Sequence, residues 1–173
     1  DGIVVARSNE AKALGIKMGV PEFQIRHLIH RHDVQVFSSN YVLYGDMSQR
    51  VMDILGQFTP NLEVYSIDEA FLSLSGFTSR NLTDYGRTIR ATVKQWTGLP
   101  VSIGMAETKT LAKVAAHVAK RTRDMAWVFD MTACPDRDSL LAELPVEDVW
   151  GLGPNSARLL KQHGIVTALD LRD

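Results

Sequence analysis

The run from Val64 to Leu74, VYSIDEAFLSL, places two adjacent carboxylates, Asp68 and Glu69, in the middle of an otherwise apolar segment. In a continuous strand, neighbouring side chains point to opposite faces, so one of the two acids would be buried in the core. We therefore predict two short strands, the first ending at Ile67 and the second starting at Ala70, with both acids at the tip of a hairpin. At such a tip the carboxylates can converge on a cation. The alternative is an ordinary solvated turn, in which Asp is common.

The composition limits what can surround this hairpin. With 173 residues, of which 45% are hydrophobic, the chain can bury the core of one sizeable domain, or of one domain and part of another. Its 19 Lys and Arg are balanced by 20 Asp and Glu, so a polyanion would have to be bound by local patches rather than by overall charge. Cys134 is the only cysteine, which excludes a disulfide framework and a cysteine-rich zinc site and fits a reducing cytoplasm. No apolar run approaches the roughly 20 residues that a membrane-spanning helix needs.

The hydrophobic pattern predicts helices and strands on both sides of the hairpin. Helices are predicted at residues 9–14, after Pro21, and at 41–58, 84–97 and 108–121. Strands are predicted at residues 34–37, 101–105 and 126–129. A polar linker is predicted at residues 131–138. The central order of helix, strand, strand, helix and strand predicts an α+β fold with a ferredoxin-like (split βαβ) sheet that lacks its first strand. That strand would precede Asp1, where the chain begins without a methionine, so we expect the sequence to be part of a longer protein.

The helix predicted at 108–121 has a basic face opposite an apolar face. The segment that starts with it contains five positive residues and no acid: Lys109, Lys113, Lys120, Arg121 and Arg123. Such a face could bind a polyanion. A solvated helix face without a ligand is the alternative.

The last segment, from Leu144 to Ile165, has the form of a helix-hairpin-helix. Gly151 and Gly153 permit positive φ angles and a close backbone approach to a ligand, and Pro154 suits the first turn of the second helix. Backbone N–H groups at that helix start would hold a DNA phosphate without reading sequence. A helical turn with glycine punctuation and no ligand is the alternative.

Taken together, these motifs resemble the Y-family translesion DNA polymerases. The resemblance rests on the SIDEA stretch at 66–70, the KTLAK helix start at 109–113 and the terminal helix-hairpin-helix, in this order. Three further stretches are similar to the UmuC branch, the catalytic subunit of bacterial DNA polymerase V: FSSNY at 37–41, YGDMS at 44–48 and EAKALG at 10–15.

The resemblance implies an error-prone DNA polymerase that copies past damaged template bases, in DNA repair and SOS mutagenesis, by two-metal nucleotidyl transfer. It implies that residues 1–40 form part of the fingers, 41–130 the palm with the acidic hairpin, and 131–173 the start of the thumb. The family's first metal-binding Asp, its sugar-discriminating aromatic residue and its little-finger domain are not in this sequence. We therefore expect an incomplete two-Mg²⁺ site and little or no activity from this chain alone.

The same resemblance assigns roles to individual residues. Asp68 and Glu69 are the expected catalytic and metal-binding residues. Lys120 falls at the position of a triphosphate-contacting lysine, Lys12 stands where many relatives have an arginine with this role, and Asn9 stands where many have a tyrosine. The expected DNA-binding residues are Gly151, Gly153, Lys109 and Lys113.

The partners implied by the resemblance are primer-template DNA, dNTP, a cleaved UmuD-type accessory dimer, RecA and the sliding clamp. The alternative is a catalytically silent or truncated relative that only binds DNA or partner proteins. A DNA-repair module consisting only of a helix-hairpin-helix would not explain the acids of the hairpin.

Overall fold

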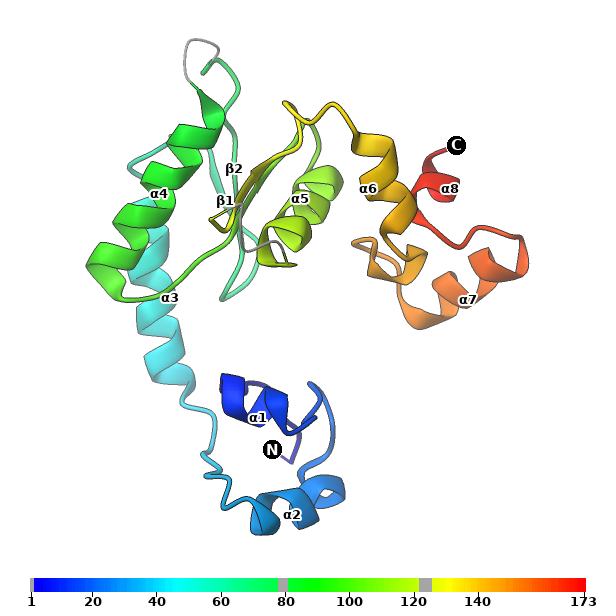
Figure 1. Ribbon diagram of the computed structural model, residues 1–173. Helices are drawn as coiled ribbons and strands as arrows, with labels where there is room; N and C mark the ends of the chain where they lie inside the picture. Colours follow the sequence, from blue (N-terminus) through cyan, green and yellow to red (C-terminus); the bar gives the residue numbers. More distant parts are fainter. Residues whose placement is uncertain (1, 78–80, 122–125) are drawn as a thin grey trace. The chain divides into compact units, whose positions relative to one another are not determined.

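The structure, a computed structural model, describes residues 2–77, 81–121 and 126–173 (Figure 1). The chain divides into two compact units, Asp1–Asp46 and Met47–Asp173, and the division falls within one helix, α3 (Tyr41–Leu55). In the part of the chain that the structure describes, no helix is both long and apolar enough to span a bilayer.

The first unit contains two short helices, α1 (Asn9–Ala13) and α2 (Glu22–Arg31), as the sequence predicts. The Ser8 hydroxyl caps α1 by accepting a hydrogen bond from a backbone N–H of its first turn, which is the common role of serine at this position. The chain then turns away at Gly15, whose φ of 79° is in the left-handed region that favours glycine. Both helix boundaries therefore follow from local sequence.

The strand predicted at 34–37 is wrong. Among the described residues none forms a strand ladder with this segment, and the side chains of Val36 and Phe37 are 61% and 84% exposed. The residue types favour a strand, but a strand also needs a partner for its backbone N–H and C=O groups. Without that partner the segment leads irregularly into α3.

The second unit combines two pairs of short strands with helices. Strand β1 (Leu62–Val64) pairs antiparallel with β2 (Ala70–Leu72), and β3 (Ile103–Met105) pairs parallel with β4 (Val128–Asp130). The helical elements are α4 (Leu82–Thr97), α5 (Lys109–Arg121), α6 (Arg137–Glu143), the 3-10 helix η2 (Val146–Asp148), α7 (Pro154–Gln162) and α8 (Ala168–Arg172).

The two strand pairs test the prediction of a ferredoxin-like sheet. The α+β class is confirmed, but the strands of the described residues form two separate two-stranded sheets rather than one. The predicted helix order is also observed. The helices α6 and α8 were not predicted, and α6 begins inside the segment expected to be a linker.

The pair β3–β4 lies between α4 and α5 (Figure 1). A side chain at Gly104 of β3 would place its Cβ 2.0 Å from the backbone nitrogen of Ala116, so α5 packs directly on the strand backbone. On the other face, Gly86 of α4 lies against the side chains of Val128 and Met105. Close packing against glycine thus fixes α5, the helix with the basic face, relative to the strands.

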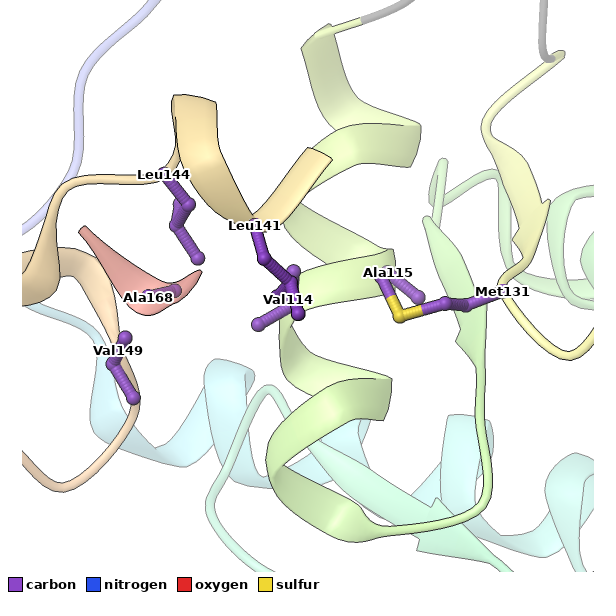
Figure 2. Packing of buried hydrophobic residues seen from close by; sticks show 7 residues of the cluster. All are labelled: Val114, Ala115, Met131, Leu141, Leu144, Val149 and Ala168. Atoms are coloured by element: carbon purple, nitrogen blue, oxygen red, sulfur yellow. The ribbon is translucent and has the colours of Figure 1, made fainter. Parts of the chain in front are cut away.

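The core lies where α5 meets the C-terminal segment. Its buried side chains are Val114, Ala115, Met131, Leu141, Leu144, Val149 and Ala168 (Figure 2). In this view the side chains of Val114 and Leu141 point toward each other, and the Met131 side chain reaches Ala115. Burial of these residues from α5, α6, α8 and the intervening loops holds the last part of the chain against α5.

Candidate functional site

The two adjacent acids lie at the tip of the β1–β2 hairpin, as the sequence predicts. The last ladder pair joins Val64 to Ala70, and the backbone nitrogens of Tyr65 and Ser66 both donate to the carbonyl oxygen of Glu69 at 3.0 Å. The first strand therefore ends at Val64 instead of Ile67, because these two hydrogen bonds close the tip early. The prediction of the second strand's start at Ala70 is confirmed.

The two carboxylates have different surroundings. Asp68 is exposed, and its Oδ1 accepts a hydrogen bond of 2.7 Å from the Ser66 hydroxyl. Both carboxylate oxygens of Glu69 lie 2.6 Å from Nζ of Lys113 on α5. Asp68 is thus oriented from within the turn, whereas Glu69 is held by a neighbouring helix.

The lysines at the start of α5 are turned toward the hairpin. Lys109 forms an ion pair with Glu63 of β1, and its Nζ lies 5.3 Å from the centre of the Phe71 ring. Lys113 binds Glu69 and lies 5.7 Å from the centre of the Tyr65 ring, a distance at which a cation is attracted to an aromatic face. In this structure both lysines expected to bind DNA are therefore paired with carboxylates of the hairpin.

The basic residues at the end of α5 have surroundings different from those of the lysines at its start. Lys120 is exposed in the last helical turn, and Arg121 lies 3.1 Å from the ring nitrogen Nε2 of His117. Arg123, which the sequence includes in the basic face, lies outside the described residues. Lys109 is the first residue of α5 and Lys120 the last but one. The basic face of α5 therefore has a paired start and an exposed end.

The glycine turn before α7 agrees with the helix-hairpin-helix prediction in part. Its first helix is only the 3-10 helix η2, and Pro154 occupies the first turn of α7 as predicted. Gly151 has a φ of 92°, in the left-handed region that glycine permits, whereas Gly153 has a φ of −81°. Gly153 instead precedes α7 in an extended conformation, with open space where a Cβ would stand.

An ion pair joins the two helical parts of this motif. Lys161 of α7 donates a hydrogen bond of 2.7 Å to Glu147 of η2. This hydrogen bond is the main reason why the pKa of Glu147 lies below its ordinary value. The pair holds α7 against η2 and so supports the turn between them.

Sequence reasoning missed an aromatic cluster next to the acids. Trp150, the residue before Gly151, donates a hydrogen bond of 3.1 Å from Nε1 to the Tyr65 hydroxyl. The ring centre of Trp150 lies 5.3 Å from that of Tyr65 and 5.6 Å from that of Phe71. A tryptophan directly before the glycine turn was the sequence signal for this contact, since a large aromatic side chain gains stability by packing on another element.

The remaining expected residues belong to the first unit. Asn9 and Lys12 both lie on α1, three positions apart, and both are exposed. Three positions correspond to nearly one turn, so the two side chains share one side of this short helix.

Two carboxylates are few for a metal site made by protein alone. Among the described residues, no group of three or more His, Cys, Asp or Glu side chains is arranged to hold a metal ion. Mg²⁺, however, is commonly bound by only one or two carboxylates together with substrate phosphates. Asp68 and Glu69 supply such oxygens, and Glu69 already accommodates a positive charge, the Lys113 ammonium group, at 2.6 Å. The donor set therefore fits Mg²⁺ held jointly with a phosphate ligand.

Known proteins are similar to this chain in sequence and in fold. Residues 1–117 match the family described as impB/mucB/samB. Protein UmuC of Salmonella typhimurium is 51% identical over 175 residues, which cover 100% of this chain and 42% of the relative. DNA polymerase IV 2 of Mesorhizobium japonicum is 37% identical over 98% of this chain and 40% of its own length.

The structural comparison leads to the same group. A solved structure described as the insertion ternary complex of Dbh DNA polymerase matches with a TM-score of 0.78 and 26% identity, over 92% of this chain and 45% of that one. The chain thus spans less than half the length of the relatives it matches. The family match includes the acidic hairpin and α5 as far as His117, and it covers more than half of this sequence. The chain therefore belongs to the impB/mucB/samB family.

Proposed function

We propose that this chain carries the acidic hairpin and part of the nucleotide and DNA sites of an error-prone DNA polymerase that performs translesion synthesis. The observation that carries the proposal is the pair of acids at the hairpin tip, with Lys113 of α5 bound to Glu69. A solvated turn would not need a half-buried lysine against one of its acids. Family membership and the names of the relatives, which include DNA polymerases, support the same reading.

In this proposal Asp68 and Glu69 provide the oxygens that hold Mg²⁺. When bound, two such ions activate the primer 3′ hydroxyl and neutralise the triphosphate. Asp68 can turn its free oxygen outward while Ser66 holds the other. Lys113 limits the negative charge of Glu69 before substrate arrives, and it keeps the carboxylate oriented.

Further residues are proposed to bind the nucleotide. Lys120, exposed at the end of α5, would contact the triphosphate as a point charge. Lys12 and Asn9, both exposed on one side of α1, are also proposed to contact a nucleotide. Lys12 can supply charge but lacks the bidentate fork of an arginine, so its contact would be less directional.

The turn of Gly151 and Gly153 is proposed to hold a DNA phosphate through backbone N–H groups at the start of α7. Lys109 and Lys113 would reach DNA only by sharing or leaving their carboxylate partners. On this assignment residues 1–40 are part of the fingers, 41–130 the palm and 131–173 the start of the thumb. A UmuD-type dimer, RecA and the sliding clamp are proposed partners in the cytoplasm.

The test is primer extension opposite an abasic site by a completed polymerase. We use this term for the present chain joined to those segments of the Salmonella typhimurium UmuC relative that lie outside the match. Glu69→Gln keeps the size of the side chain and removes its charge, so we expect extension to be lost. Glu63→Gln is the matched control, since Glu63 is also a hairpin acid that binds a lysine of α5 but lies away from the tip. We expect this control variant to extend.

Two outcomes would contradict the proposal. Equal extension by the parent and Glu69→Gln would remove the catalytic role of the hairpin acids. Binding of primer-template without any extension by the parent would leave the alternative function, a DNA-binding relative without polymerase activity.

A further inference from the structure

Trp150 connects the glycine turn before α7 to the acidic hairpin, 85 positions away in sequence. Its indole N–H donates to the Tyr65 hydroxyl, and the two rings meet nearly edge to face, at an interplanar angle of 82°. Phe71 of β2 completes the cluster with a ring centre 5.8 Å from that of Tyr65. The contact combines a directional hydrogen bond with aromatic packing, so it fixes both distance and orientation.

From Tyr65 the contacts continue directly to Glu69. The backbone nitrogen of Tyr65 donates to the Glu69 carbonyl oxygen at 3.0 Å, and the Tyr65 ring lies under the Lys113 ammonium group that binds the Glu69 carboxylate. A displacement of Tyr65 would therefore disturb Glu69 through its backbone and through its lysine partner.

This cluster is separate from the core that folds the C-terminal segment. That core is built from other residues, among them Val149, which is 7% exposed. Val146 of η2 is also buried, at 0% exposed. Tyr65 is 48% exposed, and Trp150 is half-buried. Since the buried valines anchor the turn to the rest of the unit, the aromatic contact is not needed to form the turn, and it acts instead between the turn and the hairpin.

We propose that Trp150 is a positioning residue, which through Tyr65 holds the acidic hairpin in register with the glycine turn. This inference rests on the proposed function, in which the turn binds a DNA phosphate and the hairpin tip performs the chemistry. Correct spacing between these two sites would then place the primer end at the acids. Small misplacements of reacting groups cost large factors in rate, so the contact should affect turnover more than DNA affinity.

The experiment uses the completed polymerase with Trp150→Phe, Tyr65→Phe and the double variant. Each single change keeps an aromatic ring and removes one side of the hydrogen bond. We expect each to lower the rate constant of extension by about 10- to 100-fold while the Kd for primer-template changes by less than about twofold. The double variant should be no slower than either single variant, because both changes break the same contact. Trp96→Phe, at a tryptophan of α4 that is 58% exposed, is the control and should leave the rate unchanged.

A second measurement does not depend on activity. In a variant in which every tryptophan except Trp150 is replaced by Phe, Tyr65→Phe should shift the emission of Trp150, because its indole N–H loses its acceptor. An unchanged emission of Trp150 would overturn the inference. So would extension rates equal to the parent's in both single variants, rate losses that add up in the double variant, or a loss of DNA affinity without a loss of rate. A parent that extends no primer would refute the proposed function itself, whereas an active parent with fully active variants would refute only the role of Trp150.

Discussion

Lys113 binds Glu69 through both carboxylate oxygens, each 2.6 Å from its Nζ, and the two side chains are only 25% and 36% exposed. The pair joins α5 to the hairpin tip across 44 positions of sequence. Because α5 is itself packed against β3 and the core, this ion pair ties the proposed metal-binding acid to the packed core of the second unit. Lys113 is therefore both an orienting group and a competitor for any cation that approaches Glu69.

Lys113→Gln should strengthen cation binding at the hairpin. The change removes the charge that neutralises Glu69, so the affinity for Mg²⁺ should rise by up to about fivefold, the range expected for an ion pair worth about 0–1 kcal/mol. Titration of the completed polymerase with Mn²⁺, followed by electron paramagnetic resonance, measures the effect. Lys109→Gln frees Glu63 instead and is the matched control. An equal rise in both variants would show a general charge effect rather than competition at Glu69.

Gly104→Ala should destabilise the second unit severely. The added Cβ would lie 2.0 Å from the nitrogen of Ala116 and 2.4 Å from the carbonyl oxygen of Ala112, and backbone atoms cannot move aside as a flexible side chain can. We expect the free energy of unfolding to fall by about 3 kcal/mol or more. Urea unfolding of this chain, followed by circular dichroism, is the measurement. Stability close to that of the parent would mean that α5 can shift away from β3 without cost.

The hairpin and the helices around it could be predicted because their signals are local. Two adjacent acids in an apolar run leave a turn as the one arrangement that keeps both out of the core. The helix predicted to end at residue 97 does so, and the next residue, Gly98, has a φ of 77°, which glycine adopts without strain. The prediction of a strand at 34–37 was wrong for the opposite reason. The residue types of a strand can be read from the local sequence, whereas the presence of a partner strand to pair with it cannot.

The contacts of the site could not be predicted, because they depend on how distant segments pack. The pairing of Lys113 with Glu69 requires the close approach of α5 to β3 that Gly104 allows. The contact of Trp150 with Tyr65 requires the core to bring the C-terminal segment back to the hairpin. The sequence identified the acids and the lysines separately. It contained no signal that they neutralise each other.

The stability of the C-terminal segment should depend on pH through Glu147. The hydrogen bond from Lys161 lowers the pKa of Glu147 below its ordinary value of 4.5 in the folded state. A carboxyl group with a lowered folded pKa stabilises the fold above its unfolded pKa, and this contribution is lost as the pH falls through the folded pKa. Glu147→Gln should therefore lower the Tm at neutral pH, and the difference from the parent should vanish in acid. Because the pair is exposed, the effect should be small.

Lys161→Gln tests whether Lys161 is the cause. It should reproduce the same pH-dependent loss of Tm as Glu147→Gln, and the double variant should add nothing further. A Tm difference for Glu147→Gln that persists unchanged at low pH would assign the effect to packing rather than to ionisation.

Alanine substitutions at Gly151 and Gly153 separate the effect of backbone strain from the effect of a lost DNA contact. Gly151→Ala forces a side chain into a φ of 92°, so we expect a loss of about 1–2 kcal/mol in unfolding free energy. Gly153→Ala meets no such penalty, since its φ is −81° and the space around its Cβ position is open. If a DNA phosphate approaches the backbone at the start of α7, however, the added methyl group at Gly153 stands in its way. Gly153→Ala should then weaken primer-template binding about tenfold while the Tm stays near that of the parent.

Fluorescence anisotropy of labelled primer-template at several salt concentrations checks this prediction. The affinity should fall at every salt concentration while the slope of log K against log salt stays that of the parent, because backbone N–H groups make the contact and no cationic side chain is lost. A Gly153→Ala variant with the parent's affinity at every salt concentration would mean that DNA does not approach this backbone. The turn would then be a structural link to the hairpin through Trp150, and phosphate binding would have to be sought at the exposed end of α5, where Lys120 lies.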